Sequence, residues 1–395
     1  IDQILVDIEI AINDEFLNHY QFKKSQSFVI EDSLAEEIYQ NFKKQGKISG
    51  EFPGGAIGNT LHNYSVLSDS PSIALGTINK NIQVGDYAYQ YLCKTNANVN
   101  LAYLQPCDRA MGRALCFISE DGERTFAVSK GCMDDLNPEF VPSELIKGAA
   151  SLLISAYSLR DESTPIAKAN IRACELALEA NVPVVMSMGT SSLVCQKKDF
   201  FKSFIKKYVS VVAMNQDEAE CLTDNADPLL SCQELLDITD MALVTVGKSG
   251  LYLSSYVDKD KARVTKDPLH TKSIVEYNQY EYSRAMKKED CSEPVKIFTH
   301  INPFMGGPLQ IQNTNGAGDA ALSAILHDMS ANSFHRAHIP NSPKHAARYL
   351  TYSSLSQISK YANRVSFEVL IQNSPRLVRG LPAKEDSLEE AYWDN

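Results

Sequence analysis

Residues 313–319 read Asn-Thr-Asn-Gly-Ala-Gly-Asp, and residues 320–326 continue as Ala-Ala-Leu-Ser-Ala-Ile-Leu. The second stretch consists mostly of good helix formers, so we expect a helix to begin directly after the two glycines. Such a start directs backbone N–H groups and the positive end of the helix dipole toward one point, where an anion can bind. Asp319 falls in the first helical turn. By itself, the stretch is equally consistent with an anion site and with a structural role, in which the glycines form a turn and Asp319 is an acidic charge at the helix N-terminus.

Short apolar segments alternate with segments of helical periodicity along the rest of the chain. Ile4 to Val6 is expected to open the first strand, and apolar spacing predicts a helix over 166–180. Repeated strand–helix–strand alternation is typical of an α/β protein with a mostly parallel central sheet and helices on both faces. Ligands of such sheets bind beyond the carboxyl ends of the strands. Further strands are predicted at 73–77, 151–157, 182–188, 209–214 and 242–246.

Two regions depart from this alternation. In the first, Asp121-Gly122 separates two β-rich stretches, which predicts an antiparallel hairpin. The pattern is equally consistent with a lid over a ligand and with a hairpin added to the edge of a sheet. The second region, 254–292, is polar, carries both charge signs and contains Tyr277, Tyr280 and Tyr282. We interpret it as an insertion with some helix.

The composition of the 395-residue chain excludes some classes of partner. Its net charge is −11 and its pI is about 5.3, so it repels nucleic acid, and no block of Lys and Arg overrides this repulsion. No apolar run approaches the ~20 residues that span a membrane. The nine cysteines are scattered without a Cys-x-x-Cys pair. This spacing argues against a zinc site and favours unpaired thiols in a reducing cytoplasm.

Three other segments bring flexible or polar residues to positions where a ligand can bind. Gly54-Gly55 permits a close backbone approach and Asn59 offers both a donor and an acceptor, although Gly-Gly before a helix is also a common turn. Asn215-Gln216-Asp217-Glu218 follows a predicted strand, and it suits both a Mg²⁺ site and an N-terminal helix cap. Gly247-Lys248-Ser249 matches the end of a P-loop, but a strand precedes it, so we interpret it as a strand-end turn.

Together these segments resemble the ribokinase-like sugar and nucleoside kinases. The resemblance covers essentially the whole chain and implies one ribokinase-like domain over 1–395. It further implies a small β lid formed around 8–30 and 99–130, with a polar insertion around 254–292. The motifs that carry it, in chain order, are Gly54-Gly55 with Asn59, Asn215 with Glu218, Thr245 with Gly247 and Gly250, and the Asn-Gly-Ala-Gly-Asp of 315–319.

One position departs from the family pattern. The last signature of the family usually opens with Asp-Thr, whereas Asn313-Thr314 stands here. In this chain the first position therefore lacks the carboxylate that would contact a metal or a monovalent cation there. It leaves the expected role of Asp319 unchanged.

The activity implied by the resemblance is a cytoplasmic phosphotransfer that uses ATP and Mg²⁺, with K⁺ as a further candidate ion. A closer likeness to the purine-nucleoside members implies transfer to the 5′-hydroxyl of inosine and guanosine, which gives IMP and GMP in purine salvage. The partner is then a small-molecule nucleoside, not a nucleic acid or a membrane, and a homodimer is an assembly that the resemblance allows. Segments carrying this closer likeness are 1–9, 55–66, 213–223, 300–328 and 341–393.

The resemblance also implies a role for individual residues. Asp319 is expected to accept the proton of the attacking hydroxyl, while the amides of Gly316, Ala317 and Gly318 donate to the transferring phosphoryl group. Glu218 is expected to position Mg²⁺ through water. The remaining expected contacts are Asn215, Thr245, Gly247 and Asn313 with ATP, and Asp2, Asp7, Gly54, Gly55, Asn59 and Arg160 with the nucleoside.

Alternatives remain open at this stage. Arg160 is equally well interpreted as a surface charge near Asp161 and Glu162. An adenosine or sugar kinase of the same fold would show the same motifs. A non-catalytic nucleoside-binding protein would keep the fold, although the presence of Asp319 and both loop glycines argues against it. A scaffolding role of the 254–292 insertion is compatible with catalysis.

Overall fold

The computed structural model describes residues 1–24, 26–68, 70–84, 86–304, 311–312, 314–372, 374–378 and 380–381. The chain divides into two compact units. The first unit comprises 1–59 and 71–189, and the second comprises 60–70 and 190–395. Helix α3 (Ala56–Leu67) contributes residues to both.

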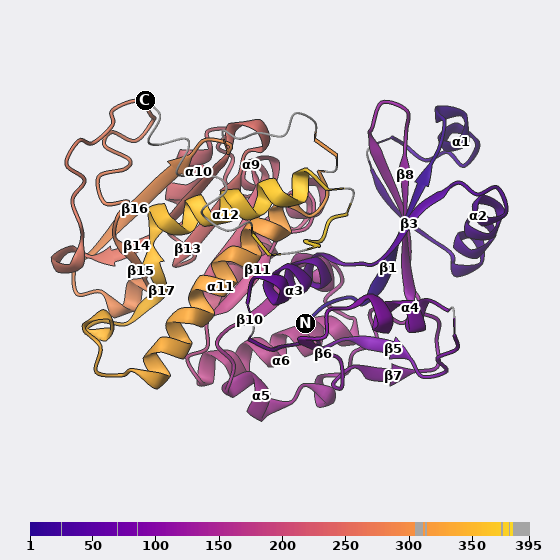
Figure 1. Ribbon diagram of the computed structural model, residues 1–395, viewed down its shortest axis with the longest axis horizontal. Coiled ribbons are helices and arrows are strands. Elements are labelled where there is room, and N and C mark those ends of the chain that lie inside the picture. The colour runs from indigo at the N-terminus through magenta and orange to yellow at the C-terminus, as the bar shows by residue number, and fades with distance from the viewer. Residues whose placement is uncertain are drawn as a thin grey trace. The chain divides into compact units, whose positions relative to one another are not determined.

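A five-stranded sheet with the order β2-β9-β8-β1-β3 forms one part of the first unit (Figure 1). It contains strands from both segments expected for a β lid and adds β3, whereas β6 (Val99–Asn100) and β7 (Gln105–Cys107), which also fall within 99–130, lie in two separate two-stranded sheets. The predicted hairpin is confirmed, because β8 and β9 are antiparallel and Gly122 of the connecting turn has a φ of 84°. The elements are β1 (Leu5–Ala11), β2 (Ser27–Ile30), β3 (Ile48–Pro53), β8 (Gly112–Ile118) and β9 (Arg124–Ser129), with helices α1 (Asp14–His19) and α2 (Asp32–Lys44).

The other part of the first unit contains a parallel strand pair, β10 with β11, and helices α5 and α6. The strand predicted over 73–77 is instead two short strands, β4 and β5. The chain breaks between them because the carbonyl oxygen of Leu75 accepts from the N–H of Asp2 at 3.0 Å, and the side chain of Ile4 packs against Gly76. The elements are β4 (Ser72–Ile73), β5 (Thr77–Asn79), α4 (Tyr87–Lys94), β6 (Val99–Asn100), β7 (Gln105–Cys107), α5 (Ser143–Lys147), β10 (Leu152–Ser155), α6 (Pro165–Glu179) and β11 (Val184–Ser187).

The second unit is built on a mixed sheet. β12 and β13 are parallel, as predicted, and β14 to β17 add antiparallel pairings. Figure 1 shows α11 and α12 passing in front of these strands and α9 and α10 behind them, so both faces are covered by helices. The elements are α7 (Ser191–Gln196), α8 (Lys198–Tyr208), β12 (Val211–Asn215), α9 (Gln216–Thr223), α10 (Pro228–Leu235), β13 (Met241–Thr245), β14 (Leu251–Asp258), β15 (Arg284–Met286), β16 (Pro294–Ile301), α11 (Ala317–His338), β17 (Tyr349–Ser354) and α12 (Leu355–Leu370).

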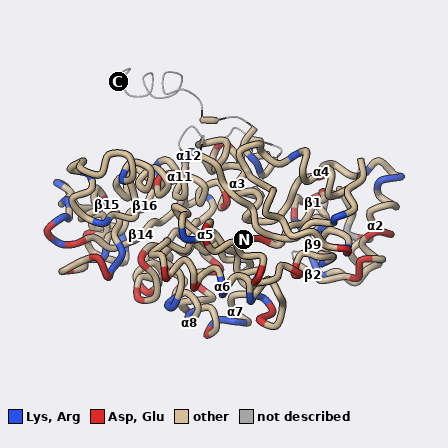
Figure 2. Tube along the Cα trace, turned by 90° about the horizontal axis from the view of Figure 1, so that it is seen from below, with Lys and Arg blue, Asp and Glu red and all other residues tan. Residues whose placement is uncertain are grey.

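The polar insertion predicted over 254–292 begins too early, because 254–258 belong to β14; residues 259–292 lie in the connection between β14 and β16, which contains β15. Its helical content is limited to two three-residue 3₁₀ turns, Lys259–Lys261 and Lys288–Asp290, among the described residues. Figure 2 shows Lys and Arg residues interspersed with Asp and Glu residues around β14 and β15. The mixed charge that marks this region in the sequence is therefore spread over a folded part of the second unit.

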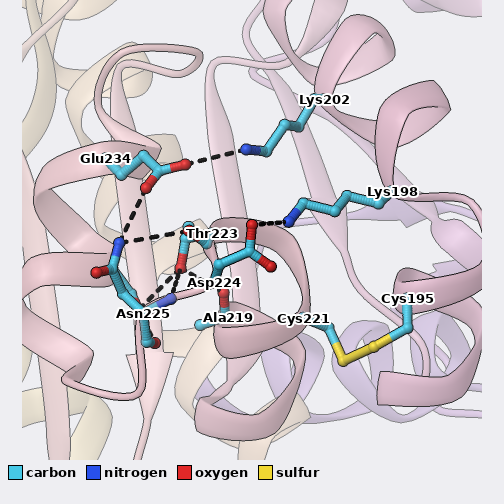
Figure 3. A network of polar contacts seen from close by, with 10 residues as sticks. Cys195, Lys198, Lys202, Ala219, Cys221, Thr223, Asp224, Asn225 and Glu234 are labelled. Atoms are coloured by element: carbon cyan, nitrogen blue, oxygen red, sulfur yellow. Dashed lines mark hydrogen bonds and ion pairs between the residues drawn. A yellow bond between two sulfur atoms is a disulfide. The ribbon is translucent and has the colours of Figure 1, made fainter.

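The cysteine prediction is wrong for one pair. All nine cysteines lie in the described part of the chain, where seven are free thiols and Cys195 and Cys221 form a disulfide (Figure 3). The two are 26 residues apart in sequence. They meet because α7 packs against α9, which the spacing of the cysteines in the sequence does not reveal. The bond ties α7 to the helix that begins beside Asn215.

None of the described helices combines the length and the apolarity needed to cross a lipid bilayer.

Candidate active site

All of the residues predicted to bind the nucleoside lie in the first unit, and all except Arg160 gather around the end of β3 and the start of α3. β1 pairs with β3, and the N–H of Gly54 donates to the carbonyl oxygen of Leu5 at 2.8 Å, which brings Gly54 beside Asp7. A Cβ atom at Gly54 would lie 2.5 Å from Cγ of Asp7. One at Gly55, whose φ is 89°, would lie 2.5 Å from Oδ2 of Asp2. Only glycines allow the backbone to pass so close to these two carboxyl groups.

The carboxyl group of Asp2 also holds the start of α3. Its Oδ2 accepts from the N–H of Gly58 at 3.1 Å, and the side chain is 5% exposed. The N–H of Asn59 donates to the carbonyl oxygen of Gly55 at 3.1 Å, so Asn59 lies in the first turns of the same helix, where it is buried. An acid at a helix N-terminus is electrostatically favourable, and the contact brings Asp2, Gly55 and Asn59 together.

Arg160 lies at a different place in the first unit, directly after the 3₁₀ turn Ala156–Leu159 that follows β10. Its guanidinium group is 5.4 Å from the centroid of the Tyr157 ring. That ring also contacts Gly189, where a Cβ atom would lie 3.0 Å from it. The side chain of Arg160 is half-buried and thus belongs to a packed strand end and not to a fully solvated surface.

In the second unit, Asn215 and Glu218 form a capping box at the start of α9. The Oδ1 atom of Asn215 accepts from the N–H of Glu218 at 2.9 Å, and the N–H of Asn215 donates to Oε2 of Glu218 at 3.0 Å. The Nδ2 atom of Asn215 donates to Oε1 of Glu218 at 2.8 Å. The helix-cap interpretation is therefore realised, and it fixes the Glu218 carboxyl group at the carboxyl end of β12.

The neighbouring strand β13 ends at Thr245, which lies opposite Asn215 in the parallel pair. Residues 247–249 form a short 3₁₀ turn into the antiparallel strand β14, which confirms that the segment is not a P-loop. Gly247 has a φ of 47° and is exposed. Gly250 is tightly enclosed, since a Cβ atom there would lie 1.9 Å from the carbonyl oxygen of Ile301.

Helix α11 begins at Ala317, between the two glycines and two residues before the predicted start. Gly316 is its N-cap residue and has a φ of 76°, a conformation that favours glycine. A Cβ atom at Gly316 would lie 2.4 Å from the carbonyl oxygen of Pro375, whereas one at Gly318 would meet no atom of the described residues within 4 Å. Because the N-cap residue is a glycine, it has no side chain of its own to accept from the first N–H groups of the helix. The first turn of α11 is therefore open to a ligand on the side of Gly318.

Glu218 and Asp319 are electrostatically coupled. Burial raises the pKa of Glu218 to about 7, with further increases from Asp217 and Asp319, although the backbone N–H of Asn215 works to lower it. Glu218 is 4% exposed. Two neighbouring carboxyl groups attract a divalent cation, because the cation relieves their mutual repulsion.

The Glu218 carboxyl group, fixed by the capping box, suits Mg²⁺ better than a metal held in a cage of protein ligands. Within the described residues, no group of three or more His, Cys, Asp or Glu side chains is arranged to hold a metal. Mg²⁺ commonly takes one or two carboxylates and completes its shell with water and substrate phosphates. Asn313, where the family carboxylate is missing, lies outside the described residues.

Three positions next to these residues were not singled out in the sequence. Gly76 lies against the backbone of Asp2, Tyr157 lies under Arg160, and Pro375 lies against Gly316. A lone glycine inside a predicted strand often marks a close backbone approach, so Gly76 carried a usable signal. Tyr157 and Pro375 carried none, because their neighbours are set by the fold.

The chain is similar over its full length to known enzymes. It is 50% identical over 395 residues to the guanosine-inosine kinase of Escherichia coli (strain K12), covering 100% of this chain and 91% of that protein. The guanosine-inosine kinase of Escherichia coli O157:H7 shows the same identity and coverage. A comparison with protein-family models found no match.

Solved structures share the fold at low sequence identity. A probable sugar kinase from Rhizobium etli superposes with a TM-score of 0.72 at 19% identity, covering 96% of this chain and 94% of that one. The adenosine kinase from Sinorhizobium meliloti gives a TM-score of 0.70 at 19% identity, covering 96% of this chain and 95% of that one. The predicted α/β fold of the ribokinase-like kinases is thereby confirmed.

Proposed function

The chain belongs to the guanosine-inosine kinases, and on that premise we propose that it transfers the γ-phosphoryl group of ATP to the 5′-hydroxyl of guanosine and inosine. The products are GMP and IMP, so the reaction returns purine nucleosides to the nucleotide pool. The full-length identity of 50% is the observation that carries this proposal. The close approach of Gly54 to Asp7 and the capping box at Glu218 are consistent with it.

The chemical step is assigned to the start of α11. Asp319, in the first helical turn, accepts the proton of the 5′-hydroxyl as the hydroxyl oxygen attacks phosphorus and the bond to ADP breaks. The N–H groups of Gly316, Ala317 and Gly318 donate to the transferring phosphoryl group, supported by the positive end of the helix dipole. The open side at Gly318 gives a phosphoryl group room to approach.

Glu218, with Asn215, is the residue that would position Mg²⁺, through water. When bound, the ion supplies positive charge to the phosphate oxygens. The capping box keeps the Glu218 carboxyl group in place before any ligand arrives, so little ordering is required on binding. Asn215 and Thr245, on adjacent strand ends, and Gly247 in the following turn are assigned to ATP, together with Asn313.

The ribose is assigned to the first unit. Asp2 and Asp7 present carboxylate oxygens that accept hydrogen bonds from sugar hydroxyls, while Gly54 and Gly55 keep the backbone out of the way. Asn59 adds a donor and an acceptor. Arg160 is assigned to the purine oxygen at position 6, where a guanidinium donor would favour guanosine and inosine over adenosine.

We further propose that both units work as one kinase domain in the cytoplasm, where ATP is supplied, on a small-molecule nucleoside. A homodimer is the assembly to test first by light scattering. A K⁺ requirement can be decided by comparing initial rates in potassium and sodium buffers at equal ionic strength.

A substrate panel tests the proposed function. The purified protein is incubated with ATP and Mg²⁺ and with guanosine, inosine, adenosine or ribose in parallel, and the products are identified by chromatography and ³¹P NMR. We expect 5′-monophosphates of guanosine and inosine as the main products. Strong turnover of adenosine or ribose without turnover of guanosine or inosine would instead favour an adenosine or sugar kinase, which the structural neighbours also represent.

A further inference from the structure

The polar insertion contains a compact loop held by its own hydrogen bonds. The N–H of Thr265 donates to the carbonyl oxygen of Gln279 at 2.7 Å, and its hydroxyl donates to the carbonyl oxygen of Asn278 at 2.6 Å. The Oδ1 atom of Asn278 accepts from the N–H of Leu269 at 2.8 Å. Thr265 and Asn278 are 9% and 5% exposed. Residues 265–279 are therefore a closed loop with buried polar anchors.

Two side chains of this loop contact the rest of the second unit. The hydroxyl of Ser273 donates to Oδ2 of Asp227, the residue that caps α10. The Nζ atom of Lys272 donates to the Tyr252 hydroxyl at 3.2 Å, and it lies 5.5 Å from the centroid of the Tyr252 ring. Tyr252 is on β14 and is 7% exposed. The insertion is thus fixed to both α10 and β14.

Tyr252 continues this chain of contacts to the turn assigned to ATP. Its ring lies against the imidazole of His300, its neighbour on β16, with centroids 4.3 Å apart. The Nε2 atom of His300 bonds to the carbonyl oxygen of Ser249 at 2.9 Å. A carbonyl only accepts, so Nε2 carries the proton and donates. The N–H of Ser249 in turn donates to the carbonyl oxygen of Val246 at 2.8 Å, which closes the 3₁₀ turn.

We propose that Lys272 is a positioning residue for ATP, through which the insertion holds Tyr252, His300 and the turn 247–250 in the nucleotide-binding conformation. The inference rests on the proposed function, because the turn is assigned to ATP there. It gives the insertion a role in the reaction: a segment outside the sheet braces the backbone at the end of β13. Lys272 acts through two aromatic rings and is not assigned a contact with ATP.

The first test replaces Lys272. We expect Lys272→Met to raise the KM for ATP roughly threefold to tenfold, the effect of one lost hydrogen bond, with an unchanged KM for guanosine and an unchanged melting temperature. Lys272→Arg should restore most of the affinity for ATP. The matched control is Lys266→Met, which removes the same charge from an exposed position of the same loop and should leave both KM values unchanged.

A second variant tests the route through Tyr252. Tyr252→Phe removes the hydroxyl that accepts from Lys272 but keeps the ring that packs on His300, so it should raise the KM for ATP to a similar extent. The double variant should show no larger effect than the larger single one, because both changes break the same contact. Additive effects would overturn the proposed route.

Direct ATP binding separates this inference from the proposed function. Calorimetric titration of wild type and Lys272→Met with ATP and Mg²⁺, without any acceptor, should show the same weakening as the KM values. Equal ATP affinities would overturn the inference even if guanosine is phosphorylated normally. A rise in the KM for both substrates with a lower melting temperature would also overturn it, since it would show a general structural role. Failure of wild type to phosphorylate guanosine and inosine would refute only the proposed function.

Discussion

Replacing Glu218 with glutamine should make the stability of the protein less dependent on pH. Burial is the main reason that the pKa of Glu218 rises from 4.5 to about 7. When folding raises the pKa of an acid, the folded state binds the proton more tightly than the unfolded state does, and this stabilises the folded state at low pH. The stabilisation is lost as the pH rises through the pKa of the folded state. Applied to a shift from 4.5 to about 7, the linkage relation gives a loss of roughly 2–3 kcal/mol between pH 5 and pH 8.

Glutamine keeps part of the capping box. Its side-chain oxygen can still accept from the N–H of Asn215, now 3.0 Å from Oε2 of Glu218. In the wild type, the Nδ2 atom of Asn215 donates to Oε1 of Glu218 at 2.8 Å. In the variant, the NH₂ group of the glutamine would face this donor, so one hydrogen bond is lost. That loss costs about 1 kcal/mol at any pH. At pH 5 that loss is offset, because the folded wild type must hold a proton that its unfolded form has already partly lost, so wild type and variant should be about equally stable. At pH 8 the variant should be about 2 kcal/mol more stable.

Thermal unfolding at pH 5 and pH 8, without nucleotide or Mg²⁺, measures this difference. The melting temperature of Glu218→Gln relative to wild type should rise by about 5–10 °C between the two pH values. Glu220→Gln is the matched control, because Glu220 is an exposed glutamate on the same helix, and it should show no such rise. The same stability difference at both pH values would refute the assignment of a buried, repelled carboxyl group at Glu218.

Three other changes test separate parts of the structure. Gly54→Ala would bring a Cβ atom to 2.5 Å from Cγ of Asp7, so it should raise the KM for the nucleoside about tenfold or more, with little change in the KM for ATP; an unchanged nucleoside KM would contradict the ribose assignment. Gly316→Ala should destabilise the protein by about 1–3 kcal/mol and lower kcat, because a left-handed residue would meet Pro375; wild-type stability would argue against this backbone. Titration of denatured protein should find seven thiols before reduction and nine after it, and Cys195→Ser should cost about 3 kcal/mol; nine thiols before reduction would contradict the disulfide.

The parts of the fold that could be predicted follow from local patterns. The alternation of apolar strands with helical segments gave the α/β class, and the two glycines that flank Ala317 marked the start of α11 to within two residues. Asp121-Gly122 predicted the β8–β9 hairpin. Each of these signals lies within a few residues of the feature that it predicts, so no knowledge of distant contacts was required.

The features that could not be predicted depend on distant contacts. Apolar periodicity does not determine strand direction, so the antiparallel strands after β13 went unseen. The Cys195–Cys221 disulfide depends on the packing of α7 against α9. The same holds within the site: Asp7 and Gly54 were named separately, but their close approach follows from the pairing of β1 with β3.

The central claim is that Asp319 is the base for phosphoryl transfer. Steady-state rates and guanosine binding of Asp319→Asn test it most directly, because asparagine keeps the size of the side chain and removes its basicity. We expect kcat to fall by about 10² to 10⁴, the usual contribution of a general base, while the Kd for guanosine stays close to that of wild type. A kcat near the wild-type value would contradict the assignment.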